Sequence, residues 1–255
     1  MFINNFDPVA VQILSIEIRW YSLAYIIGIV LGWILSKKIF ISDNEIKEKF
    51  DNYITYLILG IIIGGRLGYV IFYNFEYFSS NLIDVFKVWQ GGMSFHGGLL
   101  GIIFISIWFA KKNNHNPFKY LDIVAIVAPV GIFFGRIANF INSELYGIET
   151  SVPWAVKFVQ IDNLYRHPSQ IYEAILEGLI LFLILIFIYL KKNYRVGMCS
   201  YAFLFFYGIF RITSEFFREP DVQLGYLFGS LTMGMLLSAL MIIFGVILYR
   251  NKNEL

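Results

Sequence analysis

Three arginines stand inside long apolar runs of the sequence, at positions 66, 136 and 211. A charge within a membrane span is costly unless it is paired, so Arg66, Arg136 and Arg211 are candidate functional residues. A guanidinium binds two phosphate oxygens at once, whereas a lysine ammonium acts as a point charge. The three arginines therefore indicate a site for a ligand that carries phosphate.

Acidic and aromatic residues accompany these arginines. Glu215 follows Arg211 by one helical turn, and Glu173 and Glu177 are spaced to share one face of a helix. Two interpretations remain open: the acids neutralise the arginines in structural ion pairs, or the arginines bind an anion. The neighbouring polar side chains favour a lipid-headgroup site, and they are Tyr69, Tyr207 and Asn139.

His96 is the histidine best placed for chemistry. An unperturbed imidazole titrates near neutral pH, so His96 could act as a general base or donate a hydrogen bond to phosphate. Glycines on both sides of it permit close approach of ligand or backbone, although close helix packing through small residues explains them equally well. These glycines are Gly91, Gly92, Gly97, Gly98 and Gly101.

The sequence lacks the residues that several other common chemistries require. The chain has one cysteine, Cys199, which is expected at the inner end of a helix, away from the arginines. No two histidines have metal-ligand spacing, and there is neither a phosphate-binding Walker loop nor a Gly-x-Ser-x-Gly elbow. We therefore expect no metal and no nucleotide cofactor.

The composition is that of an integral membrane protein. Hydrophobic residues make up 58% of the 255 positions and charged residues 15%, and a net charge of +2 is too small for a nucleic-acid-binding surface. The apolar runs are continuous rather than alternating, which favours helices over a β-barrel. We predict one all-α domain, residues 1–255, with about seven transmembrane helices: Trp20–Ser36, Tyr53–Tyr73, Met93–Ala110, Leu121–Ile141, Ile171–Leu190, Gly197–Phe217 and Leu224–Tyr249.

Lysine and arginine in the connecting segments predict the orientation. Twelve of them fall on one side, namely Lys37, Lys38, Lys47, Lys49, Lys111, Lys112, Lys119, Lys191, Lys192, Arg195, Arg250 and Lys252. Five fall on the other, namely Arg19, Lys87, Lys157, Arg166 and Arg218. The bias places the N-terminus outside and the C-terminus in the cytoplasm.

The same topology predicts where the site lies. At 1.5 Å per residue, Arg66, Arg136 and Arg211 each lie about 20 Å from the inner end of their span, in the outer half of the bilayer. The outward segments are Phe75–Gly92, Asn142–Gln170 and Arg218–Gln223. Alternation over Trp154–Val159 predicts a strand, and we expect residues 142–170 to form a small extracytoplasmic cap.

These residues lie in motifs that resemble those of the bacterial prolipoprotein diacylglyceryl transferases, and the resemblance covers the whole chain. The longest motif runs from Gly135 to Gly147, with Ala138 and Ser143 where the family often has glycine. The other motifs are Gly64–Tyr69, Gly91–Gly98, Arg166–Glu173, Tyr207–Arg211 and Glu215–Arg218.

The resemblance implies a multi-pass enzyme of the bacterial cytoplasmic (inner) membrane, in lipoprotein biosynthesis. It would transfer the diacylglyceryl group of phosphatidylglycerol to the lipobox cysteine of a preprolipoprotein signal peptide. The products would be a thioether and glycerol 1-phosphate. The base that removes the thiol proton stays open between His96, a carboxylate and the cationic field itself.

The resemblance also assigns residues. Arg136 and Arg211 match the family's essential arginines. Other matches to functionally important positions are His96, Tyr207, Asn139, Glu144, Gly147 and Tyr21. We expect His96 and Tyr207 to be catalytic, and Arg66 to bind phospholipid together with Asn139, Glu144, Gly147 and Tyr21. Supporting positions are Glu215, Tyr69, Gly97 and Gly98.

Two alternative functions use the same arginines. An anionic-solute transporter would line a path with them, but it needs polar groups leading to both faces, and the inner halves of these spans carry almost no charge. Another phospholipid-headgroup transferase would keep the arginine site and differ only in its acceptor. Substrate identity separates that enzyme from the first interpretation.

Overall fold

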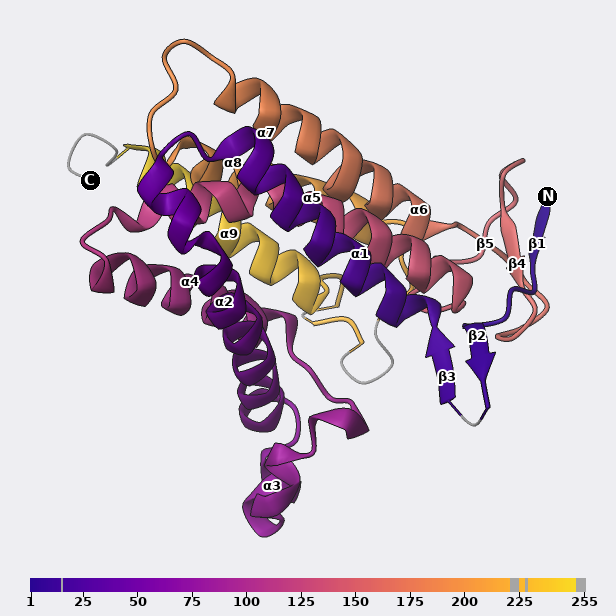
Figure 1. The fold of residues 1–255 in the computed structure, drawn as a ribbon. Coiled ribbons are helices and arrows are strands. Elements are labelled where there is room, and N and C mark those ends of the chain that lie inside the picture. Colours follow the sequence, from indigo (N-terminus) through magenta and orange to yellow (C-terminus); the bar gives the residue numbers. More distant parts are fainter. Residues whose placement is uncertain (15, 221–224, 228, 251–255) are drawn as a thin grey trace. The chain divides into compact units, whose positions relative to one another are not determined.

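The computed structural model describes residues 1–14, 16–220, 225–227 and 229–250. Contacts divide the chain into two compact units, Met1–Ser36 with Asp122–Leu255 and, separately, Lys37–Leu121. Both are mainly helical in their described residues, as the apolar runs predict (Figure 1).

The first unit is built from helices that approach closely through glycine. Gly28 of α1 lies against Gly131 of α5, and Gly208 of α8 lies against the Ser238 carbonyl of α9. A π-helical stretch, Ala174–Ile180, joins α6 and α7 into one rod (Figure 1). The helices are α1 (Trp20–Leu35), α5 (Pro117–Ile141), α6 (Ser169–Glu173), α7 (Leu181–Tyr189), α8 (Met198–Glu215) and α9 (Met233–Arg250).

A buried carboxylate fixes the start of α8. Asp122, 1% exposed, accepts hydrogen bonds from the Tyr194 hydroxyl (2.6 Å), the Gly197 backbone N–H (2.6 Å) and both the N–H and the hydroxyl of Ser200 (2.7 and 2.6 Å). Such a carboxylate replaces water with protein donors, which lets the loop before α8 pack against α5.

Short strands lie near the N-terminus of this unit and between α5 and α6. The alternation over Trp154–Val159 predicted a strand, and β4 (Val156–Phe158) confirms it. β4 pairs in parallel with β1 (Phe2–Asn4) and antiparallel with β5 (Tyr165–Arg166). A separate hairpin pairs β2 (Val9–Ile13) with β3 (Ile16–Arg19). The predicted all-α fold is therefore correct only for the main body, because the described residues include five short strands, three of them N-terminal.

The second unit is a helical hairpin with a folded connection between its two long helices. It holds α2 (Asn44–Phe72), α3 (Phe75–Ser80), 3₁₀ turns at Leu82–Phe86 and Val88–Gln90, and α4 (Phe95–Lys112). α2 begins at Asn44 because the Asp43 carboxylate accepts the N–H groups of Glu45 (3.1 Å) and Ile46 (3.4 Å). A side chain on Gly64 or Gly97 would overlap the backbone of the opposite helix, so α2 and α4 pack without side chains there.

Five of the described helices are long and apolar enough to cross a membrane, by length and composition: Trp20–Phe40, Asn44–Phe72, Pro117–Ile141, Ser169–Tyr189 and Met233–Arg250. The predicted third and sixth spans are helices, α4 and α8, but these are not among the five. α8 carries Arg211 and Glu215, whose charges reduce its apolarity. The chain is thus a mostly helical membrane protein, and the number of crossings stays a prediction.

The last predicted span differs in its start. α9 begins at Met233 rather than near residue 224, because Leu227 and Leu231 form an antiparallel bridge around Gly229, which has φ +86°. The Thr232 hydroxyl then accepts the Met235 N–H and starts the helix. Leu224, the end of the predicted segment Arg218–Gln223 and the loop cation Lys252 lie outside the described residues.

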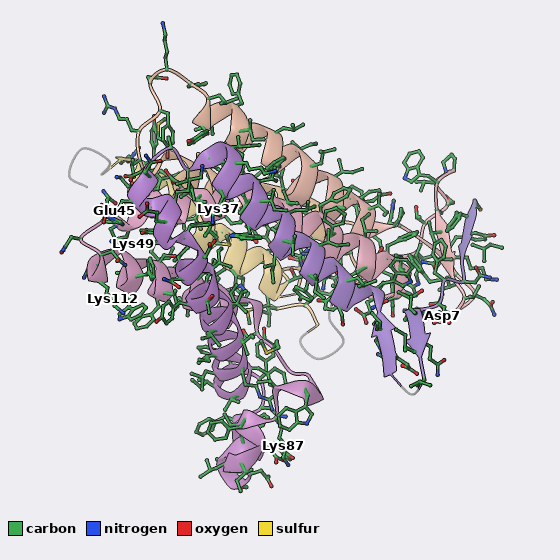
Figure 2. The ribbon with its side chains drawn as sticks, in the orientation of Figure 1. Asp7, Lys37, Glu45, Lys49, Lys87 and Lys112 are labelled. Atoms are coloured by element: carbon green, nitrogen blue, oxygen red, sulfur yellow. The ribbon has the colours of Figure 1, made fainter. Side chains whose placement is uncertain are left out.

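Charged side chains mark the two ends of the second unit. Figure 2 shows Lys37, Lys49 and Lys112 with Glu45 at one end of α2, whereas Lys87 lies toward the other, near α3. Lys37 pairs with Asp51 at 2.8 Å and Lys49 with Glu45 at 2.7 Å. The cation-rich end is the one that the charge bias assigns to the cytoplasm.

Candidate active site

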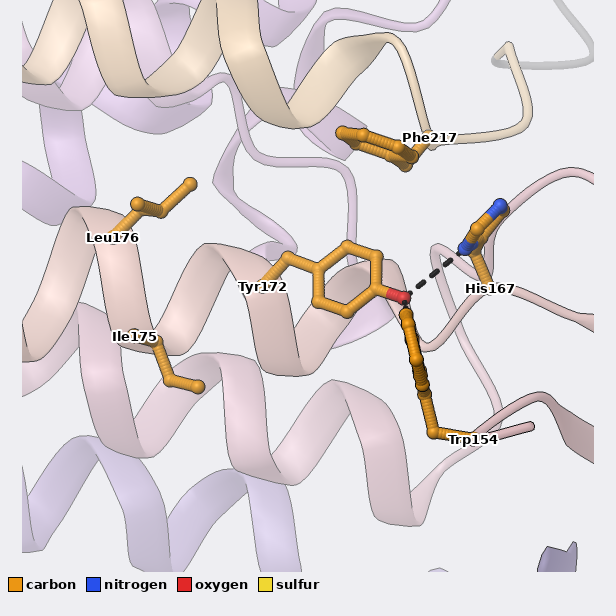
Figure 3. A pocket seen from close by; sticks show the side chains of 6 residues that line it. All are labelled: Trp154, His167, Tyr172, Ile175, Leu176 and Phe217. Atoms are coloured by element: carbon orange, nitrogen blue, oxygen red, sulfur yellow. Dashed lines mark hydrogen bonds between the residues drawn. The ribbon is translucent and has the colours of Figure 1, made fainter. Parts of the chain in front are cut away.

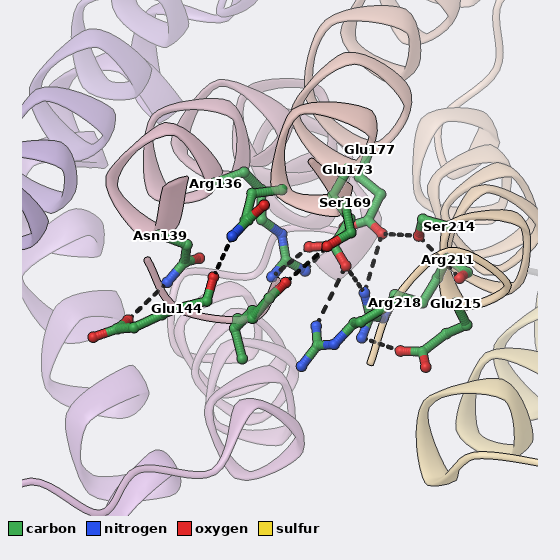
Figure 4. Close-up of polar contacts among 12 residues, drawn as sticks. Arg136, Asn139, Glu144, Ser169, Glu173, Glu177, Arg211, Ser214, Glu215 and Arg218 are labelled. Atoms are coloured by element: carbon green, nitrogen blue, oxygen red, sulfur yellow. Dashed lines mark hydrogen bonds and ion pairs between the residues drawn. The ribbon is translucent and has the colours of Figure 1, made fainter. Parts of the chain in front are cut away.

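Arginines from α5 and α8 converge on two buried glutamates of the α6–α7 rod (Figure 4). Arg136 Nη1 lies 2.9 Å from Glu173 Oε2, and its Nη2 lies 3.0 Å from Glu177 Oε2. Arg211 Nη1 lies 2.6 Å from Glu173 Oε1 and 3.6 Å from Glu177 Oε1. One pair of carboxylates therefore bridges the two arginines.

A third arginine and a third acid complete this group. Arg218 Nη1 lies 3.3 Å from Glu173 Oε1, and Arg211 Nη2 also pairs with Glu215. We call Arg136, Arg211, Arg218, Glu173, Glu177 and Glu215 the charge cluster. Its three cations and three anions balance, which is how buried charges are tolerated.

Helical spacing and nearby hydroxyls hold the acids in place. Glu173 and Glu177 are fully buried and four residues apart along the rod. The Ser214 hydroxyl donates to Glu177 Oε1 at 3.1 Å, and the Thr232 hydroxyl donates to Glu215 Oε2 at 2.9 Å. The carboxylates thus have fixed positions, and they set the distance between the two guanidinium groups that they bridge.

Ion pairing and anion binding are compatible at this cluster. The structure shows the ion pairs that the sequence allowed, between Arg136, Arg211 and the two glutamates. A guanidinium has five N–H donors. The two contacts of Arg136 each engage one terminal nitrogen, so this side chain can hold both carboxylates and still donate to a phosphate.

Several other predicted site residues lie in the same unit. Asn139 Nδ2 donates to Glu144 Oε2 at 3.1 Å, and the Glu144 N–H donates to the Asn139 carbonyl at 2.9 Å. Tyr207 is buried within electrostatic reach of Arg136 and Arg211. The described geometry therefore brings the lipid-binding candidates of α5 next to the charge cluster.

Tyr21 connects to this region through a second tyrosine. The Tyr25 hydroxyl donates to the Tyr21 hydroxyl at 3.0 Å, and the two rings meet edge to face at 4.9 Å. Tyr25 in turn interacts electrostatically with Arg136 and Glu144. The first turns of α1 thus contribute a pair of hydroxyls to this side of the unit.

Gly147 has a structural reason to be glycine. A side chain there would overlap the carbonyl oxygens of His167 and Phe217, because three chain segments meet at this point. The Gly147 carbonyl accepts from Arg166 Nη1 at 3.1 Å, and Arg166 also pairs with Asp162 at 2.6 Å. The Arg166 hydrogen bond holds the pKa of the Asp162 carboxyl below its usual value.

The loop between Asn139 and Gly147 has an unusual backbone. Ser143 and Leu145 have φ of +57° and +55°, a region that favours glycine. The Ser169 hydroxyl donates to the Leu145 carbonyl at 2.9 Å, and Gln170 Nε2 donates to the Glu144 carbonyl at 2.6 Å. Contacts from α6 hold the loop in this conformation.

Arg66 belongs to the second unit and contacts backbone there. Its Nε donates to the Val85 carbonyl at 2.9 Å, and its Nη atoms donate to the carbonyls of Asp84 (2.6 Å), Lys87 (3.2 Å), Gly91 (2.5 Å) and Gly92 (3.2 Å). The guanidinium also lies over the Phe78 ring, 5.0 Å from its centre. Arg66 therefore organises the connection between α2 and α4 in its own unit.

The remaining candidates also lie in the second unit. His96 is half-buried in the first turn of α4, where the Ser94 hydroxyl accepts the Gly97 N–H at 3.2 Å. Gly97 is a packing glycine against α2, whereas Gly98 has ordinary contacts with Ile61. The Tyr69 ring lies against Gly92 and stacks on Tyr73.

An apolar pocket of about 370 Å³ opens in the first unit (Figure 3). Its polar atoms satisfy one another, because Trp154 Nε1 donates to the Tyr172 hydroxyl at 2.7 Å and that hydroxyl lies 3.0 Å from His167 Nδ1. Burial lowers the pKa of His167, which favours a neutral ring whose Nδ1 accepts the hydrogen bond of the Tyr172 hydroxyl. The lining residues are Trp154, His167, Tyr172, Ile175, Leu176 and Phe217.

Sequence reasoning missed two members of the site. Arg218 was assigned to an outer loop, yet it is 6% exposed and pairs with Glu173. Gln170 was not singled out, yet it is fully buried and anchors the loop that carries Glu144. The signal available in the sequence was spacing. Arg218 follows Arg211 by seven residues, and Gln170 precedes Glu173 by three.

Comparison with known proteins supplies the family. Residues 8–250 match the family model described as prolipoprotein diacylglyceryl transferase. Among similar proteins are three named phosphatidylglycerol–prolipoprotein diacylglyceryl transferase. The one from Rhodopseudomonas palustris is 49% identical over 252 residues, covering 95% of this chain and 88% of the relative.

The other two come from Rickettsia. The Rickettsia rickettsii protein is 47% identical over 257 residues, covering 99% of both chains. The Rickettsia bellii protein is 46% identical over 253 residues, covering 97% of this chain and 96% of the relative. Because the family model and these relatives match nearly every residue, and Arg136 and Arg211 of its motifs meet in one buried cluster, this chain belongs to the prolipoprotein diacylglyceryl transferase family.

Proposed function

We propose that this protein transfers the diacylglyceryl group of phosphatidylglycerol to the lipobox cysteine of preprolipoproteins. The cysteine sulfur forms a bond to the glycerol carbon while the bond from that carbon to the phosphate oxygen breaks. The electron pair leaves on that oxygen, so the products are a thioether-linked lipid and glycerol 1-phosphate. The thiol proton passes to a base.

The observation that carries the proposal is the bridged pair of arginines, Arg136 and Arg211, in a chain of this family. Charge develops on the leaving phosphate in the transition state, and preorganised cations at low dielectric lower that barrier. Glu173 and Glu177 fix the arginines in advance, so little reorganisation is needed as the bond breaks.

The other residues have proposed roles around this pair. Asn139, Glu144 and Tyr21 bind the lipid headgroup region, Gly147 keeps the outer loop closely packed, and Tyr207 stands beside the arginines. His96 takes the thiol proton or donates to phosphate, and the pH profile of His96→Gln separates these roles. Only a base role predicts that the acidic limb of the rate profile disappears.

Arg66, Tyr69, Gly97 and Gly98 have supporting roles within the second unit. The contacts of Arg66 favour a positioning role for it over direct phospholipid binding, since its guanidinium donates to backbone carbonyls. Glu215 supports Arg211 directly.

We further propose the topology. The chain crosses the bacterial cytoplasmic membrane about seven times with the N-terminus outside, which places the charge cluster in the outer half of the bilayer. Residues 142–170 form an extracytoplasmic cap over that face. Because both substrates reach the site through the bilayer, phosphatidylglycerol and the signal helix of the preprolipoprotein enter sideways between helices.

The test uses the purified full chain in detergent with phosphatidylglycerol and a peptide that carries a lipobox cysteine. Mass spectrometry measures the diacylglyceryl mass on the cysteine, and a second assay measures released glycerol phosphate. Arg136→Ala and Arg211→Ala are compared with wild type and with Arg195→Ala, an exposed arginine outside the cluster.

Removing one electrostatic stabiliser of a transition state typically costs about 100-fold or more in rate. We therefore expect product from wild type and Arg195→Ala, and at least about 100-fold less from the folded cluster variants. A folded wild type that binds phosphatidylglycerol and gives no product would refute the transfer. Turnover at the wild-type rate in both arginine variants would refute the role of Arg136 and Arg211 in the reaction.

A further inference from the structure

Three buried oxygens beside the charge cluster have no hydrogen-bond partner among the described residues: Gln170 Oε1, Asn142 Oδ1 and Ser143 Oγ. Gln170 is 0% and Ser143 1% exposed. A buried acceptor without a donor costs free energy, and native proteins satisfy such groups in most cases. A group of three in one place therefore points to a ligand that brings donors.

The orientation of Gln170 is fixed by its own contact. Its Nε2 donates to the Glu144 carbonyl at 2.6 Å, and a carbonyl can only accept, so the amide cannot be turned over. The acceptor Oε1 is therefore the amide atom that points away from the Glu144 carbonyl.

The three oxygens share one neighbourhood. Gln170 bonds the backbone of Glu144, and Asn142 and Ser143 directly precede that residue. The Ser143 N–H donates to the Phe140 carbonyl at 3.2 Å, which folds this stretch back over the end of α5. The residues thus lie where the loop after α5 meets the start of α6.

This neighbourhood continues the charge cluster outward along both helices. On α6, Gln170 comes three residues before Glu173, so the two lie on adjoining turns of one face. On α5, Arg136 and Asn139 are spaced in the same way, and Asn142 follows three residues later. Charged groups therefore give way to neutral acceptors toward the outer ends of both helices.

We propose that Gln170 Oε1 and Asn142 Oδ1 bind the headgroup hydroxyls of phosphatidylglycerol. This rests on the proposed function, which puts the lipid phosphate at Arg136 and Arg211. The headgroup glycerol lies beyond the phosphate, on the side away from the acyl chains, and it carries two hydroxyl donors. Two carbonyl-type acceptors match two hydroxyls, and the Ser143 hydroxyl can donate or accept beside them.

The proposal makes these residues the source of headgroup selectivity. A site that is built to hydrogen-bond a substrate hydroxyl rejects the analogue without it, because its buried acceptors then stay unpaired. A phospholipid whose headgroup is propanol has the same three carbons and phosphate but neither hydroxyl. It should therefore bind the arginines normally and lose only the outer contacts.

The experiment measures kcat/KM of the full chain for phosphatidylglycerol and for phosphatidylpropanol, with the lipobox peptide held constant. Variants are Gln170→Met, which keeps the length and removes both the acceptor Oε1 and the Nε2 donor to the Glu144 carbonyl, and Asn142→Ala, which removes the acceptor Oδ1. Gln160→Met is the matched control, because Gln160 is exposed and its Nε2 also donates to a backbone carbonyl, that of Phe6 at 2.8 Å.

Wild type and Gln160→Met should prefer phosphatidylglycerol roughly 10-fold to 100-fold, because each buried acceptor left unpaired lowers the phosphatidylpropanol value by about a factor of 10. Gln170→Met should lose most of that preference while also lowering both values, because it removes the anchor of the Glu144 loop, and Asn142→Ala should lose part of the preference by a fall in the phosphatidylglycerol value alone. A purely structural role would lower both substrates by the same factor and would overturn the proposal. Asn142→Ala decides the question if Gln170→Met does not fold.

Different results would refute the hydroxyl subsite and the transfer reaction. If wild type turns over phosphatidylglycerol and phosphatidylpropanol equally well, the hydroxyl subsite is wrong and the transfer reaction stands. If a folded wild type turns over neither, the proposed function itself is wrong, and the subsite falls with it.

Discussion

Glu173 offers the sharpest test of how the charge cluster is held. Its carboxylate contacts three guanidinium groups, of Arg136 (2.9 Å), Arg211 (2.6 Å) and Arg218 (3.3 Å), and it is fully buried. Glu173→Gln keeps the shape and removes one negative charge. The balance of three cations and three anions then becomes three and two.

The size of the effect follows from burial. Leaving a buried charge without its partner typically costs about 3–5 kcal/mol, and the retained amide oxygen offsets part of this. We expect Glu173→Gln to lose roughly 2–4 kcal/mol of unfolding free energy. The excess positive charge should also bind an anion, so phosphate should stabilise the variant more than it stabilises wild type.

Denaturant unfolding in detergent micelles, with and without inorganic phosphate, measures both effects. Glu48→Gln, an exposed glutamate of α2, is the matched control and should change the free energy by less than about 0.5 kcal/mol. A Glu173→Gln protein as stable as the control, with no added response to phosphate, would refute the view that this carboxylate neutralises the cluster.

Three further outcomes are expected. Arg66→Lys replaces a guanidinium that donates to five backbone carbonyls by a single ammonium group. A protease should therefore cleave the variant within residues 81–92 several times faster than it cleaves wild type. Equal rates of cleavage would show that those hydrogen bonds are dispensable. Asp122→Asn should lower the unfolding free energy by about 2–3 kcal/mol with KM unchanged, and a wild-type value would contradict the anchoring role. Because burial lowers the pKa of His167 below 6.5, the unfolded chain binds its proton first, so stability should be flat above about pH 6.5 and fall below it; His167→Phe should lose that pH dependence.

Apolar runs predicted the helices well and their polar ends poorly. α1 begins at the predicted Trp20, whereas α2 begins at Asn44, nine residues before the predicted Tyr53. The difference arises because residues 44–52 are polar and helical, and the signal for their start is the Asp43 cap rather than hydropathy. Strand β1 could not be predicted, because it exists only through pairing with β4.

Contacts of the candidate site could be predicted from the sequence where two side chains pair with each other. Arg211 and Glu215 are four residues apart, and that spacing alone indicates contact. Arg66 and Arg136 have similar surroundings in the sequence, yet one contacts backbone carbonyls and the other carboxylates. Carbonyls occur at every residue, so no sequence pattern marks them as partners.

The parallel pairing of β1 with β4 has a consequence for the order of assembly. β1 (Phe2–Asn4) emerges first from the ribosome, but its partner, Val156–Phe158, follows more than 150 positions later. The segment Lys37–Leu121 can complete its own contacts in the interval, because it is contiguous. The earliest residues of the chain are thus among the last to be fixed, and the first unit closes only when synthesis has passed the whole of the second.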